Sequence, residues 1–362
     1  MSSLRECSRA VLTACILATA LTAASAQPPP LTPLPAPAAV NPAHVELGRH
    51  LFFEPRLSGD GSRSCASCHI PSRGFADGEP LSRGYNGTEY FRNAPGLLSV
   101  RLRPRLMWDG RGTHLAGVVR EMVLSAQFMN GNADIIVERI RQIPHLFMLW
   151  RRAFGESGER RGEQVFQAIA EYLKTLDFGP GPVDSALRGE ASLPPLADEG
   201  MRLFKGKAGC VACHHGPLLS DGRPHRLGVP DHAALVRDPL RTISLLSHHA
   251  ENGLANPMVE RGDIGVYAIN KNAGDRGSFI TPGLRGLSHT APYMHNGRYA
   301  SLEAVVDFHD RGGGPGSELH PLRLTAYERR ALVAFLQALS PPLQDVAEPP
   351  THEYLPVDRI RR

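Results

Sequence analysis

The pentapeptides CASCH at residues 65–69 and CVACH at residues 210–214 determine how this chain must be organised. Both follow the pattern C-x-x-C-H, in which two thiols bond to the vinyl groups of one haem and the histidine binds its iron. We therefore predict two covalently bound haem c groups. Their expected attachment residues are Cys65 and Cys68 with ligand His69, and Cys210 and Cys213 with ligand His214. Two disulfides, or one zinc site shared by the four thiols, are the alternatives for these cysteines.

The other two of the six cysteines lie in a leader that we expect to be removed. Cys7 and Cys15 fall within residues 1–26, where two arginines precede an apolar stretch at residues 11–21 and the small residues A-S-A at 24–26. This order is typical of a secretory signal peptide, so we expect a periplasmic protein. Cys15 also fits a lipobox loosely, which leaves lipoprotein anchoring as the alternative.

The composition is that of an ordinary globular protein. The 362 residues are 42% apolar and 21% charged, which excludes a collagen, a coiled coil or a disordered chain. The net charge of +4 is not concentrated in a basic cluster, so we expect no nucleic-acid partner. No stretch after residue 26 reaches the ~20 apolar residues that a membrane span needs.

The two motifs divide the chain into two similar units. Each unit has an amphipathic helix before its motif, long loops after it and helices at its end, while strand patterns are scarce. We predict a mainly α fold with two cytochrome c-like haem domains in one chain. The expected divisions are a Pro-rich leader at 27–43, an N-terminal domain at 44–178, a linker at 179–195, a C-terminal domain at 196–342 and a tail at 343–362. The expected helices lie at residues 44–53, 118–141, 162–176, 197–205, 302–308 and 325–339.

Further sequence blocks accompany the motifs. They are residues 47–58, the sequences R-N-A-P at 92–95 and W-D-G-R at 108–111, and residues 284–303, which include T-A-P-Y-M-H-N-G. In order and spacing these blocks resemble bacterial di-haem cytochrome c peroxidases and MauG. The resemblance implies one haem that is open to hydrogen peroxide and a second, six-coordinate haem that stores or passes electrons. It also implies a periplasmic redox protein or a protein substrate as partner.

The resemblance assigns roles to residues outside the haem motifs. Trp108 falls on the tryptophan that lies between the two haems in this family, where an indole can relay oxidising equivalents during catalysis. Trp150 has no such match, and we expect it to be core packing. Asn93, Thr290 and Pro292 fall on positions that bind a structural calcium ion, and amide and carbonyl oxygens suit this hard cation. The alternatives are a core aromatic for Trp108 and a turn residue for Asn93.

The second haem departs from the standard peroxidase in its sixth ligand. At the position of the family's methionine this chain has His309, and MauG has a tyrosine there. We predict that His309 gives a haem with two imidazole ligands, whose reduction potential is lowered because the more basic ligand favours ferric iron. Met294 and Met258 are rival ligands at positions that do not match. A histidine at a helix C-terminus also needs no metal to be stabilised.

The first haem departs from the standard peroxidase as well. The family's gating histidine aligns near Tyr85, and no histidine lies between His69 and His114. This favours the MauG-like or MbnH-like branch, in which the peroxide-reactive haem is open without prior reduction.

The residues that move protons on the first haem are also replaced. The family's distal glutamine and glutamate align with Val118 and Phe128, neither of which can carry a proton. Glu121 is the candidate catalytic replacement, with Gln127 and His114 as further candidates. All three also fit as plain surface residues.

Three functions remain open on the sequence. The first is an oxidoreductase of the MauG type, which uses peroxide to oxidise tryptophan in a partner protein. The second is a peroxidase that reduces hydrogen peroxide with electrons from a small redox protein. The third is a non-catalytic di-haem electron carrier. The absent gating histidine favours the first, and Phe128 keeps the third open.

Overall fold

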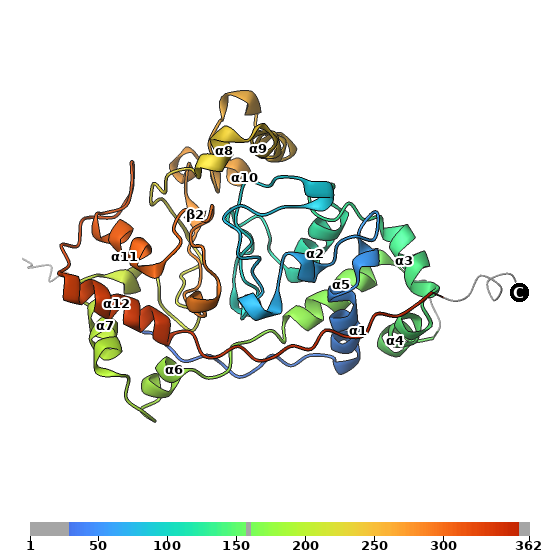
Figure 1. Ribbon diagram of the computed structural model, residues 1–362, viewed down its shortest axis with the longest axis horizontal. Coiled ribbons are helices and arrows are strands. Elements are labelled where there is room, and N and C mark those ends of the chain that lie inside the picture. The colour runs from blue at the N-terminus through green and yellow to red at the C-terminus, as the bar shows by residue number, and fades with distance from the viewer. Residues whose placement is uncertain (1–28, 157–160, 355–362) are drawn as a thin grey trace, which may run out of the picture.

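The computed structural model describes residues 29–156 and 161–354, which form two mainly helical halves side by side (Figure 1). The expected signal peptide, residues 1–26, lies outside the described residues. The helices of the N-terminal half are α1 (Pro42–Phe52), α2 (Leu115–Leu124), α3 (Ala133–Arg141), α4 (Pro144–Phe154) and α5 (Gly162–Leu173). Those of the C-terminal half are α6 (Pro182–Leu187), α7 (Pro195–Lys205), α8 (Ala233–Arg237), α9 (Pro239–Glu251), α10 (Tyr267–Asn270), α11 (Leu302–Asp310) and α12 (Ala326–Ala338).

Each half is built on a close crossing of two helices. In the N-terminal half α1 crosses α5 at Gly48, where a Cβ atom would lie 1.9 Å from the carbonyl oxygen of Ala168. In the C-terminal half α7 crosses α12 at Gly200, where a Cβ atom would lie 2.0 Å from the carbonyl oxygen of Ala331. Glycine is needed at both positions because the backbones touch there. The haem motif follows the first helix of each crossing pair.

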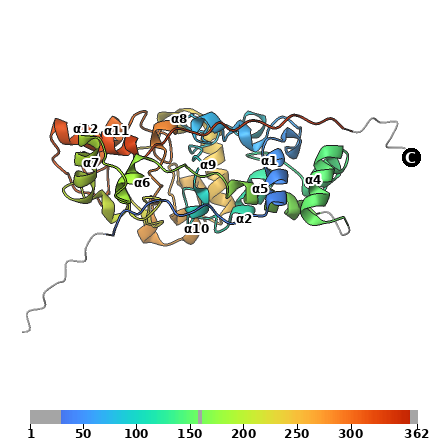
Figure 2. The ribbon, with the colours of Figure 1, turned by 90° about the horizontal axis from the view of Figure 1, so that it is seen from below.

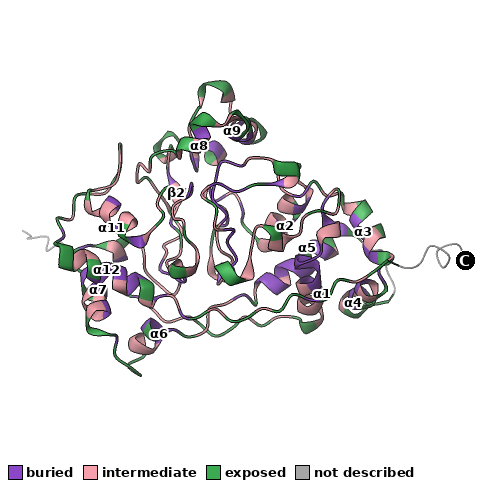
Figure 3. Cartoon of the chain, viewed as in Figure 1, coloured by how far each residue is buried: buried purple, intermediate pink, exposed green. Residues whose placement is uncertain are grey.

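A separate apolar core lies in each half, and its buried residues gather on the helices of the crossing pair (Figure 3). In the first core Leu47 and Leu51 of α1 pack with Val165 and Ile169 of α5. The second core includes Phe204 of α7 with Leu332 and Phe335 of α12. The domain limits at 44–178 and 196–342 remain a prediction. The positions of the two cores are consistent with it.

A third group of elements covers the junction of the halves. Helices α8, α9 and α10 lie at the top of Figure 1 between the two halves. The strands β1 (Pro224–His225) and β2 (Phe279–Ile280) form one short antiparallel pair. Leu235 of α8 and Leu245 of α9 pack with Tyr90 and Phe91 of the N-terminal half. Helices α8 and α9 therefore belong to the C-terminal half by sequence, but they also pack against the N-terminal half.

One of the helix predictions was wrong in detail. Residues 118–141 do not form one helix, because α2 ends at Leu124 and α3 begins after the cap of Asn132, whose side chain accepts from the backbone of Asp134. Between them Asn130 has a φ of 51°, which no continuous helix allows. The expected linker also contains the helix α6.

The leader and the tail each cross from one half of the molecule to the other. Leu31 of the leader is buried in the second core, and the chain then runs to α1, where the Asn41 side chain caps the helix. The tail leaves α12 and passes along the N-terminal half (Figures 1 and 2), where Val346 packs on the first core. Within the described residues, no helix combines the length and the apolar character that crossing a bilayer requires.

Candidate haem sites

A cavity of about 590 Å³, lined by residues of both halves, adjoins the second motif. Cys210, Cys213, His214 and His309 all line it. Its remaining wall is largely apolar and includes Phe204, Leu284, Leu302, Val306, Leu332 and Leu336. Two thiols, two imidazoles and an apolar wall fit a covalently held haem with a ligand on each side of its iron.

The orientation of His214 is fixed by the backbone. Its Nδ1 lies 2.9 Å from the carbonyl oxygen of Leu219, which leaves Nε2 free to bind iron. Leu219 has a φ of 55°, a left-handed conformation that turns its carbonyl toward the ring. Burial lowers the pKa of His214 to about 4, so the ring is neutral, as a metal ligand must be.

His309 lies on α11 and lines the same cavity. Its Nδ1 is 2.8 Å from the carbonyl oxygen of Val305, and burial lowers the pKa of this histidine too. Met294 also lines the cavity, whereas Met258 is 58% exposed. The structure therefore places His309 and one of its rivals, Met294, in the same cavity as His214.

The first motif has the same local geometry as the second. His69 Nδ1 lies 2.8 Å from the carbonyl oxygen of Phe75, whose φ of 60° is again left-handed. Burial lowers the pKa of His69. Cys65 packs against the first core, and burial raises the pKa of its thiol to about 12.

The alternatives of disulfides or a shared zinc ion do not match this arrangement. The four cysteines of the two motifs are free thiols. Cys65 packs on the first core and Cys210 on the second, so the two motifs are not brought to one metal ion.

Trp108 lies at the junction of the halves. It lines the cavity of the second motif, and its Nε1 donates to the carbonyl oxygen of Asn93 at 2.9 Å. Its own carbonyl accepts from the backbone of Ile280 at 2.9 Å. Trp150, by contrast, is fully buried in the first core and donates to Gln164 at 2.8 Å, as packing requires.

The three residues expected at calcium line one cavity. Asn93, Thr290 and Pro292 all line the same cavity, although Asn93 comes from the other half of the chain. The backbone of Asn93 donates to the carbonyl of His295 at 2.8 Å, and its side-chain amide donates to the carbonyl of Glu79 at 2.7 Å.

Glu121 lies on α2 in an ion pair with Arg111, whose Nη2 is 2.7 Å from its Oε1. Arg111 also binds Asp109 at 2.8 Å, beside Trp108. Of the two further candidates, His114 caps α2 by accepting from the backbone of Gly117 at 2.9 Å. Gln127 points toward α9 and donates to Glu251 at 3.4 Å.

The two residues at the family's distal positions are packed in apolar surroundings. Val118 packs against the first core. The ring of Phe128 stands edge-on to Tyr90, with centroids 4.8 Å apart. The backbone of Tyr85 donates to the carbonyl of Gln127 at 3.2 Å, so the loop of the family's gating histidine lies against this segment.

The structure adds a residue to this neighbourhood that sequence reasoning missed. His248 of α9 lies with its Nε2 3.2 Å from Asp109 Oδ2 and its ring against Phe91. Asp109 is thus contacted by Arg92, Arg111 and His248. Burial alone would raise the pKa of Asp109, but these partners hold it well below its usual value. No signal in the sequence connects α9 with residue 109.

Comparison with known proteins agrees with this geometry. A family model described as di-haem cytochrome c peroxidase matches residues 42–192. Cytochrome-c peroxidase IdrP2 of Denitromonas iodatirespirans is 47% identical over 329 residues, which cover 90% of this chain and 89% of that protein. The methylamine utilization protein MauG of Methylorubrum extorquens is 35% identical over 316 residues, which cover 86% and 82% of the two chains.

A solved structure supports the same assignment. A MauG-like protein associated with microbial copper homeostasis superposes with a TM-score of 0.70 and 28% identity, covering 86% of this chain and 93% of that one. The predicted mainly α fold with two cytochrome c-like domains is confirmed. The family implies two haem c groups. The chain belongs to the di-haem cytochrome c peroxidase and MauG family of oxidoreductase enzymes.

Proposed function

We propose that the enzyme reduces hydrogen peroxide at an open haem held by His69 and shares the oxidising equivalents with a haem held between His214 and His309. The unequal supply of histidines carries this proposal. His214 and His309 line one cavity, whereas the loop at the family's gating position carries the phenol of Tyr85. A haem with one protein ligand leaves a coordination position for peroxide, and a haem with two does not.

Haem supplies the redox chemistry, and the chain supplies attachment, orientation and protons. Hydrogen peroxide takes up two electrons and two protons and yields two water molecules. Cys65 and Cys68 would hold the first haem and Cys210 and Cys213 the second. The hydrogen bonds that the three proposed histidine ligands donate to backbone carbonyls fix which ring nitrogen would face iron.

Trp108 is the proposed relay between the haems, and Glu121 the proposed proton carrier. The hydrogen bond from Trp108 to Asn93 holds the indole at the junction of the halves. The ion pair with Arg111 holds the carboxylate of Glu121 near Asp109 and Trp108.

We also propose a structural calcium ion at Asn93, Thr290 and Pro292. The support is that residues from both halves meet at one cavity wall and offer amide and carbonyl oxygens. Such an ion would hold the halves at a fixed separation for electron transfer.

We infer that the electrons come from a small redox protein in the periplasm. The relative that is 47% identical carries the name cytochrome-c peroxidase, which supports this function. Oxidation of tryptophan in a partner protein is the second candidate, supported by the 35% identity with MauG and by Tyr85 at the gating position. Relatives named as enzymes leave little support for a non-catalytic carrier.

Rapid mixing of the fully ferric holoprotein with equimolar peroxide tests the proposal. The high-spin absorbance should be lost promptly without prior reduction. Replacing Cys65 and Cys68 by Ser should remove one haem and the reaction, whereas replacing Cys210 and Cys213 should remove the other haem and leave the initial reaction. No reaction over minutes would overturn the proposal. Oxidation of an added reduced small cytochrome, rather than of a tryptophan-bearing protein, would distinguish the two candidates.

A further inference from the structure

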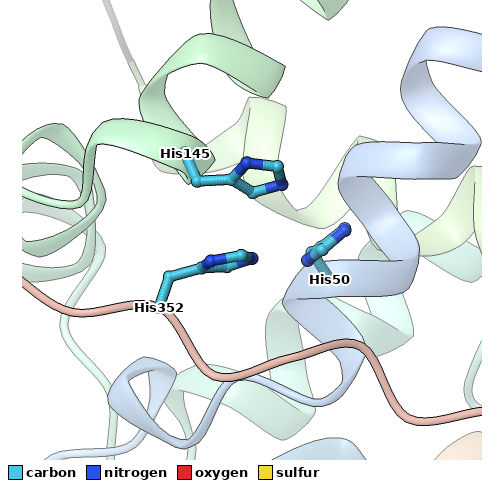
Figure 4. A group of neighbouring side chains, drawn as sticks. All are labelled: His50, His145 and His352. Carbon is cyan, nitrogen blue, oxygen red and sulfur yellow. The ribbon is translucent and has the colours of Figure 1, made fainter.

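Three histidines meet on the N-terminal half, away from the haem motifs (Figure 4). His50 comes from α1, His145 from the first turn of α4 and His352 from the tail. One ring nitrogen of each lies within 4.8 Å of the other two. We propose that these histidines bind a borderline divalent transition-metal ion such as Zn²⁺, which fastens the tail to the N-terminal half.

The three rings lie against one another, and those of His145 and His352 are stacked at an interplanar angle of 28°. The ring centroids lie 5.0 Å apart for His50 and His145, 5.3 Å for His50 and His352, and 3.9 Å for His145 and His352. A zinc ion needs Zn–N distances of about 2.0–2.1 Å, so its ligand nitrogens lie roughly 3.3 Å apart. Metal binding would therefore bring the nitrogens, which lie within 4.8 Å of one another, to this shorter separation and would turn the stacked rings of His145 and His352 apart. His352 is on an extended tail and His145 at a helix start, where such movements are easy.

The ring nitrogens are largely unused by other contacts. His352 Nε2 is buried, and no residue in the described part of the chain forms a hydrogen bond with it. His50 Nε2 lies 3.2 Å from Glu46 Oε1. A carboxylate on one nitrogen commonly orients a histidine whose other nitrogen binds metal. An unpartnered buried nitrogen beside two further imidazoles is the arrangement that a metal ion would satisfy.

The charged side chains near the three histidines pair with one another, so the imidazoles determine which metal ion the site prefers. Glu46 pairs with Arg49 at 3.3 Å, and Glu54 pairs with Arg56 at 2.5 Å, so these neighbouring side chains balance in charge. A neutral environment with three nitrogen donors is a poor site for calcium or magnesium, which prefer oxygen ligands. Imidazole suits zinc, copper and nickel. Water would complete the coordination.

The tail already lies in place for this role. Arg49 Nη1 donates to the carbonyl oxygen of Ala347 at 3.3 Å, and Val346 packs on the first core. The guanidinium of Arg56 lies 4.9 Å from the ring centre of Tyr354. These contacts on both sides of His352 bring it to His50 without a metal. An ion would thus join the tail to α1.

Metal analysis of the holoprotein tests the site. The protein is treated with a chelator, dialysed against Zn²⁺ and analysed for zinc and iron together. Zinc is the chosen probe because it is redox-inactive and leaves the haem spectra unchanged. Two haem irons per chain serve as the internal standard, so we expect one zinc for two irons. His145→Ala and His352→Ala should each lose this zinc and retain both haems.

A matched control removes a histidine elsewhere. His232 caps α8 by accepting from the backbone of Ala234, and His232→Asn keeps such a cap. This variant should bind zinc like the parent protein. His50 is buried, so its replacement is avoided as a test of binding. Zinc binding that survives His352→Ala, or a parent protein that binds none, would overturn the proposal.

A second measurement tests the fastening of the tail. Zinc should slow digestion of the tail by a carboxypeptidase in the parent protein and in His232→Asn. It should have no such effect in His145→Ala, whose tail sequence is unchanged. Equal digestion of the parent protein with and without zinc would show that no ion holds the tail.

Discussion

The proposed haem ligands His69 and His214 each depend on one backbone carbonyl for the orientation of the ring. Phe75 and Leu219 adopt left-handed φ values of 60° and 55°, which cost on the order of 1–2 kcal/mol for a residue with a side chain. Both side chains are buried in their cores, which offsets that cost. The carbonyl then fixes the ring of His69 or His214 and makes it a more basic ligand.

The ligand role of His309 leads to the first prediction. His309→Ala should convert the low-spin ferric signal of one haem to high spin and leave the other haem unchanged, because the iron loses its second imidazole. Electron paramagnetic resonance of the ferric protein measures this. His320→Ala, at another histidine of the same cavity, should change nothing. If the low-spin signal survives in His309→Ala and disappears in Met294→Leu, methionine is the ligand.

A second prediction concerns Trp108. Trp108→Phe keeps an aromatic ring but removes the readily oxidised indole and its hydrogen bond to Asn93. Both haems should be retained, while stopped-flow absorbance after peroxide addition should show slower change at the second haem. Trp150→Phe, which also removes an indole hydrogen bond, is the control and should leave this rate unaltered. Equal rates in the two variants would mean that Trp108 is structural.

Proton transfer gives a third prediction. Glu121→Gln keeps the shape and removes the carboxylate, so the reaction with peroxide should slow by about 10²-fold, the lower range for a lost general acid–base group. Haem content should stay unchanged. Gln127→Ala tests the neighbouring candidate and should have little effect, because its amide faces Glu251. A parent-like rate in Glu121→Gln would assign proton delivery to water or another group.

At the scale of elements, the two helix crossings set the positions of the motifs. A methyl group at Gly48 would meet the backbone of Ala168, so Gly48→Ala should cost about 1–3 kcal/mol through overpacking. Gly200→Ala should do the same in the other half. Thermal unfolding of the holoprotein measures both. Gly179→Ala, whose nearest atom is 3.8 Å away, should remain within about 0.5 kcal/mol of the parent. Equal stability of all three variants would contradict this account.

The elements show what local sequence can predict. Helices α1, α5, α7, α11 and α12 lie close to their expected ranges because their apolar residues recur at helical spacing. Of these, α1, α11 and α12 also begin at a capping side chain. The break between α2 and α3 was missed, since apolar spacing continues through it while Asn130 and Asn132 interrupt the backbone. Helices α8 and α9 were missed because tertiary packing on Tyr90 and Phe91 stabilises them.

The residues of the candidate sites also fall into those that the sequence predicted and those that only the folded chain brings together. A haem motif carries its thiols and its proximal histidine within five residues, so the sequence alone predicted both motifs. The facing position of His309 depended on the family resemblance, and the structure places it at the same cavity. His248 beside Asp109 and His352 beside His50 bring together residues far apart in the chain. No local pattern marks such pairs, because only the folded chain brings them together.

At the scale of the whole molecule, buried charges join the halves. Arg92 of the N-terminal half binds Asp263 through Nε at 2.6 Å and Nη2 at 2.8 Å, and the two side chains are 3% and 2% exposed. Arg241 of α9 also binds the carbonyl oxygen of Tyr90. The leader pairs with the C-terminal half through the β-bridge of Leu31 with Gly216, and the tail binds the N-terminal half where the carbonyl of Ala347 accepts from Arg49. Relative placement of the haems therefore depends on a few strong polar contacts.

The ion pair of Asp263 with Arg92 makes the last prediction. Burial alone would raise the pKa of Asp263, but the charge and hydrogen bonds of Arg92 lower it to about 2, from the ordinary value of 3.8. The folded pKa lies below the unfolded one, so this pair stabilises the fold fully above about pH 4 and less as the pH falls toward 2. That shift corresponds to about 2 kcal/mol.

Asp263→Asn leaves Arg92 buried with one charged partner fewer, so we expect a loss of about 3 kcal/mol near neutral pH. The difference from the parent protein should shrink as the pH falls from 4 toward 2, because the parent then loses the same charge. Circular dichroism melts of the holoprotein across this range measure it. Glu138→Gln removes an exposed ion pair with Arg141 and should cost less than about 1 kcal/mol. A loss of stability in Asp263→Asn that stays constant down to pH 2 would show that shape, rather than charge, holds the halves together here.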